Sequence, residues 1–265
     1  AKLTVIDKNN GENYLDALSK VDLIIKSPGI SLHNLNIKHE DYNFTSSTEL
    51  FLKHFSKQTI GITGTKGKST MATILYNTLT NNHNDDVLSG NIGVNAFDNI
   101  DTISQDTVIV MELSSHQLIN VKYSPHISIL TNLFEEHLDY YKDCDEYYEA
   151  KLNIFKYQQE GDIAIVGFKD SNRLLNTELF KTSRIFNVHD NTIKYTIDFD
   201  IRQGFIHKGT LLILEQLVEE LNIDTDVYLN TLKDFKTLPH RLEYVGRVKD
   251  IDFINDSIST IPQAT

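Results

Sequence analysis

The sequence predicts an α/β fold built on a mostly parallel sheet, and three observations support this prediction. Short runs rich in β-branched residues alternate along the chain with longer amphipathic runs. Two of the short runs, residues 107–111 (TVIVM) and 127–130 (ISIL), are largely apolar on both faces, as expected of strands that helices cover on each side. A glycine-rich turn at residues 64–67 separates another such run from a helical pattern. Strand–helix alternation of this kind is typical of a parallel sheet between two helical layers.

The predicted elements follow from the local patterns in chain order. Apolar or β-branched runs bounded by turn residues predict strands at 3–7, 21–27, 58–63, 107–113, 126–131, 162–166, 184–188 and 250–255. Amphipathic runs predict helices at 47–54, 69–81, 144–157, 210–222 and 226–235. In the fourth of these helices, apolar residues recur at helical spacing and mark a buried face: Leu211, Leu214, Val218 and Leu221.

Three segments are predicted along the chain. Residues 1–56 are expected to form a partial, Rossmann-like βαβ domain, because a new strand and the glycine-rich turn begin directly after them. Residues 57–247 are expected to form the central domain. Residues 248–265 start a strand and stop soon after it, so we expect them to open a further domain that is cut short. Because Ala1 already lies in strand-like sequence, we also expect the natural protein to begin earlier.

Composition excludes several classes of protein. The 265 residues are 40% hydrophobic and 23% charged, which indicates a globular chain with a core and not a disordered one. Lys and Arg number 25 against 37 Asp and Glu, and a net charge of −12 argues against non-specific binding to nucleic acid or to an anionic membrane. A single cysteine, Cys144, excludes an internal disulfide and a cysteine-rich zinc site. No apolar run reaches the ~18 residues of a spanning helix, and no signal peptide is recognised, so we expect a cytoplasmic protein.

The strongest local signal is a phosphate-binding loop between the strand at 58–63 and the helix that follows it. Its glycines let backbone N–H groups approach phosphate oxygens, and the helix adds its positive N-terminal end. The spacing is a variant of the usual loop, because Ile62 stands where the strict pattern has glycine. The alternative is a glycine-rich turn with incidental lysines. The residues expected to bind a nucleotide are Gly64, Thr65, Lys66, Gly67, Lys68, Ser69 and Thr70.

With this loop and several further segments, the sequence resembles the Mur ligase family, ATP-dependent enzymes that form amide bonds in peptidoglycan precursor synthesis. The matching segments occur in the family's order: 61–70 (GITGTKGKST), 89–93 (SGNIG), 112–118 (ELSSHQL), 131–139 (TNLFEEHLD), 150–152 (AKL), 239–243 (PHRLE) and 255–260 (NDSIST). Together with 27–30 (SPGI), they look most like the D-glutamate-adding branch of the family. The resemblance runs from about residue 5 to residue 265.

The resemblance implies a fold and a reaction. Residues 1–56 would bind the UDP substrate, residues 57–247 would bind ATP and Mg²⁺, and most of the family's C-terminal domain would be missing. ATP would phosphorylate a carboxylate, and an amine would displace phosphate from the acyl phosphate. The substrates would be UDP-N-acetylmuramoyl-L-alanine and D-glutamate, handled by a monomer without nucleic acid or membrane. We expect residues 1–265 alone to be inactive, since the amino-acid-recognising groups should lie in the absent domain.

The resemblance also implies roles for individual residues at the ATP site. Lys68, His137 and Lys151 would be catalytic, and Arg241 and Asp256 would contact the nucleotide. Ser69, Glu112, His137 and Lys151 would hold the metal, with Lys151 carbamylated so that it becomes anionic. Five of these residues also have an interpretation without a role in the reaction. Glu112 could be a surface acid at a strand end, His137 a neutral residue at a helix start, and Lys151 a solvated lysine. Arg241 could form an ion pair with Glu243, and Asp256 could be a turn residue.

Substrate-binding residues are expected at the ends of predicted strands. Asp7 follows the first strand and Ser27, Pro28 and Gly29 follow the second, where ligands of open α/β sheets bind. By resemblance these residues would hold the uridine diphosphate, and Asn91, Ser115 and Gln117 would line the muramoyl-alanine end. The alternative for Asp7 and Ser27 is simple turn chemistry.

The sequence departs from the family pattern at three places, and two other functions also stay open. Glu136 replaces the usual Asp, Ile258 stands where some members carry Lys, and an adenine-contacting segment expected near residues 209–210 is absent. One alternative is another ligase of the superfamily, for example one similar to folylpolyglutamate synthase. The other is a nucleotide-binding regulatory module without ligase chemistry.

Overall fold

A central six-stranded parallel sheet organises the structure, which is a computed structural model. It describes residues 2–11, 13–82, 86–98, 100–137, 139–167, 178–180, 182–195 and 206–259. The strand order is β4-β5-β3-β6-β7-β8. The strands are β3 (Thr59–Thr63), β4 (Val87–Gly90), β5 (Ile109–Glu112), β6 (Ile127–Leu130), β7 (Ile163–Val166) and β8 (Arg184–Asn187), and each neighbouring pair is parallel. The predicted α/β class with a mostly parallel sheet is therefore confirmed.

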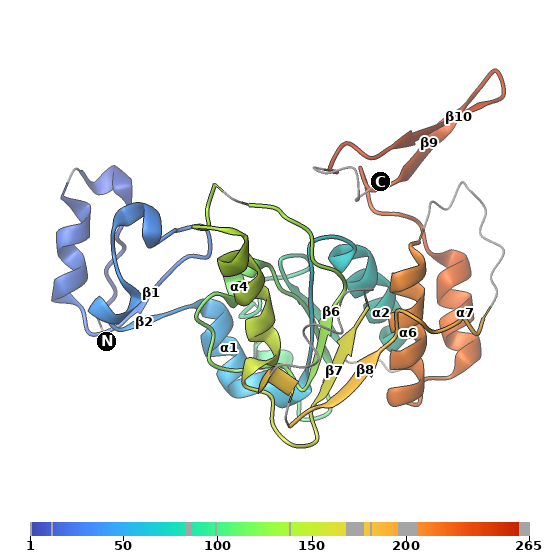
Figure 1. Cartoon of the computed structure of the whole chain (residues 1–265), viewed down its shortest axis with the longest axis horizontal. Coiled ribbons are helices and arrows are strands. Elements are labelled where there is room, and N and C mark those ends of the chain that lie inside the picture. Colours follow the sequence, from blue (N-terminus) through green and yellow to red (C-terminus); the bar gives the residue numbers. More distant parts are fainter. Residues whose placement is uncertain are drawn as a thin grey trace.

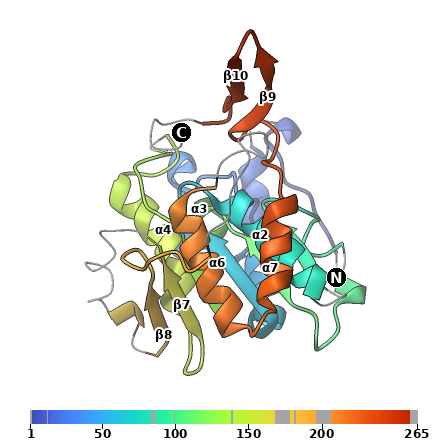
Figure 2. The ribbon, with the colours of Figure 1, turned by 90° about the vertical axis from the view of Figure 1, so that its right-hand side faces the viewer.

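Helices cover both faces of this sheet (Figures 1 and 2). On one face lie α2 (Lys68–Asn82), α6 (Lys208–Glu220) and α7 (Thr225–Asp234); on the other lie α1 (Ser47–Phe55) and α4 (Cys144–Lys156). Side chains alternate along each strand, so that Ile129 of β6 packs in the first layer and Leu130 in the second. All five residues of β3 are buried, as expected for a strand with a neighbour on each side and helices on both faces. A short helix, α3 (Ser115–Leu118), follows β5.

The N-terminal segment is less regular than predicted. A two-residue strand, β1 (Ile24–Ile25), pairs in parallel with β2 (Phe44–Thr45), and the connection between them contains the short 3-10 turns His33–Leu35 and His39–Asp41 in place of an α-helix. Further 3-10 turns span Lys8–Asn10 and Tyr14–Lys20. The strand predicted at residues 3–7 is wrong. In the described part of the chain it has no partner strand, and Leu3 and Val5 are 86% and 77% exposed, because no core covers their apolar side chains.

At the other end, an antiparallel hairpin projects from the body of the molecule (Figure 1). It consists of β9 (Glu243–Val248), which the sequence analysis missed, and β10 (Ile251–Asn255). The hairpin crosses position 247, where the sequence analysis places a domain boundary, and the predicted boundaries remain predictions. Within the described ranges, no helix has the length and apolar character that crossing a membrane requires.

The buried strands should dominate the stability of the fold. Ile129 is fully buried at the centre of the sheet, so we expect Ile129→Ala to lower the free energy of unfolding by about 2–5 kcal/mol, through lost burial and the cavity left behind. The matched control is Ile251→Ala on β10, where the side chain is 61% exposed, and it should change the free energy by less than about 0.5 kcal/mol. Urea unfolding followed by circular dichroism measures both. Equal effects would contradict the assignment of β6 to the core.

Candidate functional site

The phosphate loop lies at the carboxyl end of the central strand β3 and leads directly into α2. Gly64 and Gly67 have φ angles of +145° and +81°, which residues with a side chain rarely adopt. Space is also restricted at Gly64, where a Cβ atom would lie 1.9 Å from the Thr131 Oγ1 atom. The helix follows at once, with the Met71 N–H donating to the Gly67 carbonyl at 3.0 Å. The loop therefore has the conformation that lets backbone N–H groups face a phosphate.

Residues after the neighbouring strand β6 fix the backbone of this loop. The Asn132 carbonyl accepts from the Thr65 N–H at 3.1 Å, and its side-chain oxygen accepts from the Lys66 N–H at 2.8 Å. The Thr131 hydroxyl and the Asn132 amide both donate to the Lys66 carbonyl, at 2.7 and 3.0 Å. Sequence reasoning placed Thr131 and Asn132 in a matching segment without a role. The structure shows that they position the loop.

Two lysines converge on the loop from different helices. The Lys68 ammonium, at the start of α2, donates to the Thr65 carbonyl at 3.1 Å, and the Lys151 Nζ atom of α4 donates to the Gly64 carbonyl at 2.8 Å. Lys151 is 2% exposed, so it is not the solvated lysine of the alternative interpretation. Burial lowers the pKa of Lys68, and it lowers the pKa of Lys151 well below 10.5, helped by the charge of Lys68.

A tyrosine that sequence reasoning missed supports this arrangement. Tyr147 lies one helical turn before Lys151 on α4 and is fully buried. Its hydroxyl lies 3.1 Å from the Thr65 hydroxyl, and the Lys151 Nζ atom lies 4.7 Å from the centre of its ring. The i,i+4 spacing to Lys151 was the signal that could have identified Tyr147.

Glu112 ends strand β5 beside the loop. Its register partner is Ile62 of β3, and it is 1% exposed, which excludes the alternative of a surface acid. One carboxylate oxygen accepts from the Asn91 side-chain amide at 3.0 Å, and the other is buried without a hydrogen-bond partner among the described residues. Its negative charge acts on both Lys68 and Lys151. Asn91, expected to bind substrate, therefore orients Glu112 in this structure.

His137 lies at the rim of the same cluster. It is not at a helix start, and its φ angle of +59° is unusual for a residue with a side chain. Its ring is 45% exposed and lies 3.6 Å from the Glu136 carboxylate, which also pairs with the Lys66 ammonium at 2.9 Å. Burial is the main cause of its lowered pKa, so the imidazole is biased towards the neutral form that binds metals.

Arg241 and Asp256 meet the phosphate loop at a small hollow of about 60 Å³. The walls come from the loop (Lys66, Gly67 and Thr70), from the start of α6 and from the segments that flank the β9–β10 hairpin. The Asp256 carbonyl accepts from the Ser259 N–H at 3.0 Å, so Asp256 also has the turn role of the alternative interpretation, and its side chain accepts from the Leu242 N–H at 3.1 Å. Residues far apart in sequence are thus brought together beside the loop.

The predicted substrate residues are more dispersed. The Asp7 side chain accepts from the Asn9 N–H at 2.8 Å, as in a simple turn. The Ser115 side chain is buried in α3, and Gln117 caps the same helix by accepting from the Ser114 N–H at 2.9 Å. The turn at 27–30 lies beside the loop that carries His137, as described below.

Among the described residues, no group of three or more His, Cys, Asp and Glu side chains is placed to hold a metal ion. A closed metal cage is therefore not part of the described chain. Mg²⁺ sites next to phosphates commonly use only one or two carboxylates, with phosphate and water oxygens completing the shell. Glu112, with one unpartnered oxygen, fits such a site.

Comparison with known proteins places this geometry in a family. Residues 62–208 match the Mur ligase middle domain. A UDP-N-acetylmuramoylalanine–D-glutamate ligase of Clostridium tetani is 32% identical, and the match covers 96% of this chain and 60% of that protein. The corresponding ligase of Clostridium botulinum strain Hall is 34% identical, and the match covers 98% of this chain and 61% of that protein. The chain thus spans about 60% of the length of these relatives. The crystal structure of a MurF ligase from Thermotoga maritima in complex with ADP shares the fold, with a TM-score of 0.59, 17% identity, and coverage of 91% of this chain and 69% of that one.

Gly64 offers a test of the loop geometry. We expect Gly64→Ala to lower the free energy of unfolding by about 3 kcal/mol or more, because backbone strain adds to the clash with Thr131. Gly161→Ala is the matched control: its φ is +87°, no atom of the described residues lies within 4 Å of its Cβ position, and strain alone should cost about 1 kcal/mol. Thermal unfolding measures the difference, and hydrogen exchange at residues 64–68 locates it. Equal destabilisation by both variants would rule out close packing of the loop on Thr131.

Proposed function

The chain belongs to the Mur ligase family, and we propose that it is part of an ATP-dependent ligase that adds D-glutamate to UDP-N-acetylmuramoyl-L-alanine. Support for the family reaction comes from the relatives named above and from the ADP complex of the Thermotoga maritima neighbour. The observation that carries the proposal is the convergence of Lys68, Lys151 and Glu112 on the phosphate loop. We further propose that the enzyme is a cytoplasmic monomer that acts on small molecules, without nucleic acid or membrane.

The proposed division of labour follows the chain. Residues 1–56 would bind the UDP substrate, residues 57–247 would bind ATP, and residues 248–265 would begin a further domain. Within the central part, the loop 64–70 would hold the phosphates, and Arg241 and Asp256 would contact the nucleotide beside it. Ser27, Pro28, Gly29 and Asp7 are proposed for the uridine diphosphate, and Asn91, Ser115 and Gln117 for the muramoyl-alanine end.

Forming the amide requires an electrophilic carboxyl carbon. Phosphoryl transfer from ATP to the alanine carboxylate gives an acyl phosphate and ADP. The amine of D-glutamate then attacks the acyl carbon and breaks its bond to the phosphate oxygen. The nitrogen loses a proton, and phosphate leaves. Charge builds up on the transferring phosphoryl oxygens, and fixed cations stabilise it. Lys68 is proposed to supply this positive charge, because its ammonium is already held at the loop by the Thr65 carbonyl.

Mg²⁺ would be held by Ser69, Glu112, His137 and carbamylated Lys151, and it would neutralise charge on the phosphate oxygens. The unpartnered Glu112 oxygen and the buried Ser69 hydroxyl support this donor set. Carbamylation of Lys151 is supported by its lowered pKa, since the neutral amine is the form that attacks CO₂. It would also remove the repulsion between two neighbouring ammonium groups, because the carbamate is an anion.

Lys68 provides the first test. In the full-length protein that contains this chain, we expect Lys68→Ala to reduce ATP-dependent phosphate release at least ~100-fold, because the transferring phosphate loses its fixed cation. Lys53→Ala, an exposed lysine on α1, should leave the rate unchanged. Release should depend strictly on UDP-N-acetylmuramoyl-L-alanine and D-glutamate within a panel of acceptors and amino acids. Nucleotide binding without phosphate release would instead favour a regulatory module, and release with a different acceptor would favour another ligase.

Lys151 provides a test that does not require turnover. Protein equilibrated with ¹³C-bicarbonate at pH 8 should show a carbamate carbon signal by NMR. The signal should disappear in Lys151→Ala and persist in Lys156→Ala, which removes an exposed lysine one and a half turns further along the same helix. A wild-type protein without the signal, or a signal that survives in Lys151→Ala, would exclude a carbamate at this position.

A further inference from the structure

The turn at residues 27–30 is held by polar contacts from one side. The Ile30 N–H donates to the Ser27 carbonyl at 3.1 Å and closes the turn. The Lys26 ammonium donates to the carbonyls of Ser27 and Ile30, at 3.2 and 2.9 Å. Among the described residues, nothing lies within 4 Å of the Cβ position of Gly29, which leaves room for a ligand at the tip of the turn.

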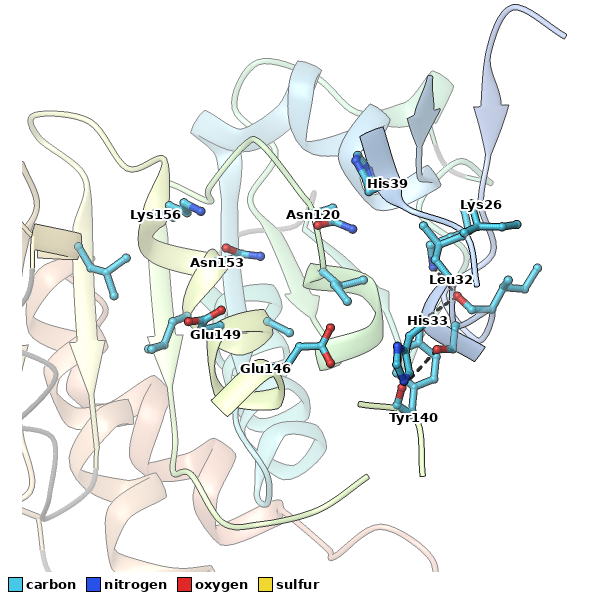
Figure 3. A pocket seen from close by; sticks show the side chains of 17 residues that line it. Lys26, Leu32, His33, His39, Asn120, Tyr140, Glu146, Glu149, Asn153 and Lys156 are labelled. Carbon is cyan, nitrogen blue, oxygen red and sulfur yellow. Dashed lines mark hydrogen bonds between the residues drawn. The ribbon is translucent and has the colours of Figure 1, made fainter. Parts of the chain in front are cut away.

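Tyr140 of the central domain contacts this turn directly. Its hydroxyl lies 3.0 Å from the Pro28 carbonyl and 2.9 Å from the Ile30 carbonyl, so its single proton is shared between them. The Ser31 hydroxyl donates in return to the Tyr140 carbonyl at 3.2 Å. Figure 3 shows Tyr140 and Lys26 together at this edge of a cavity. Burial raises the pKa of Tyr140 to about 12, so the hydroxyl keeps its proton at neutral pH.

The other end of Tyr140 is tied to the candidate active site. Its backbone N–H donates to the His137 carbonyl at 3.0 Å, so the two residues form one tight turn. Its ring meets the His116 ring edge-on, with centroids 4.2 Å apart, and His116 in turn lies 5.1 Å from the His137 ring. A displacement of Tyr140 would therefore disturb both the turn at 27–30 and the segment that carries His137.

A large cavity lies next to Tyr140 and the end of the turn. The cavity has a volume of about 710 Å³ and lies between the N-terminal segment and α4. Glu149, Asn153 and Lys156 line it from α4 (Figure 3). The spacing of these residues along the helix places them on the side opposite Lys151. Open space therefore adjoins Ile30 and Tyr140 on this side.

We propose that Tyr140 is a positioning residue that docks the turn 27–30 onto the His137 segment, and so places the nucleotide-sugar substrate relative to the phosphate loop. This inference rests on the proposed function, because it takes the turn as part of the nucleotide-sugar site. Tyr140 does not itself contact the reacting atoms. Its role predicts an effect on acceptor affinity with little effect on ATP.

Tyr140→Phe in the full-length protein tests the proposal. We expect the KM for UDP-N-acetylmuramoyl-L-alanine to rise about five- to tenfold, as for loss of one or two hydrogen bonds, while kcat and the KM for ATP change less than about twofold. Amide exchange at residues 27 and 29–31 should become faster. Tyr157→Phe, the same change on a tyrosine that is 40% exposed, should alter none of these quantities.

The outcomes separate this inference from the proposed function. If the wild type releases no phosphate with any acceptor, the proposed function fails, and the exchange measurement still decides whether Tyr140 holds the turn. Unchanged exchange and unchanged acceptor KM in Tyr140→Phe would overturn the inference. A mobile turn with an unchanged acceptor KM would overturn it too, because the turn would then not position the substrate. If Tyr140→Phe does not fold, Ser31→Ala removes the reciprocal hydrogen bond and is judged by the same measurements.

Discussion

The candidate site depends on one constraint: two lysine side chains are placed beside the phosphate loop, and burying their positive charges costs free energy. Lys151 is buried and Lys68 is partly buried, and both donate to backbone carbonyls of the loop. Removing an ammonium group from water is expensive unless negative charge or hydrogen bonds compensate it. Glu112 and Glu136 supply part of that compensation. The lowered pKa values of both lysines indicate that the compensation is incomplete, and the proposed carbamate on Lys151 together with an anionic ligand beside Lys68 would complete it.

The parallel sheet explains why these groups meet although they are distant in sequence. The carboxyl ends of parallel strands lie at the same edge of the sheet. The residues that follow the adjacent strands β5, β3 and β6 are therefore neighbours in space. The loop follows the middle strand of the three, Glu112 ends the strand on one side, and Thr131 and Asn132 follow the strand on the other. The glycine at position 64 is required by this crowding, since Thr131 occupies the space that a side chain would need.

Much of this arrangement could be predicted from local sequence, and the failures have a common physical origin. Two-sided apolar runs identified β3, β5, β6 and β7, because a strand buried on both faces has a strong local pattern. The edge strand β4 and strand β9 were missed, since each depends on a partner that local patterning does not reveal. The predicted strand at 3–7 failed for the same reason, since no strand in the part of the chain that the structure describes pairs with it. The loop was identified locally, whereas the supporting contacts of Asn132 and Tyr147 are tertiary and have no motif of their own.

Asn91 shows why residue type alone does not define a role. A side-chain amide can donate equally well to a ligand or to a protein carboxylate. Here it donates to one oxygen of Glu112, and the other oxygen has no hydrogen-bond partner in the described part of the chain. A buried carboxylate oxygen without a partner favours a cation at that point, whereas the nearby Lys68 ammonium favours an anion. Neither a bare metal ion nor a free phosphate satisfies both demands. A metal ion bound to phosphate oxygens would satisfy them together, because the cation would meet Glu112 while the phosphate would meet Lys68.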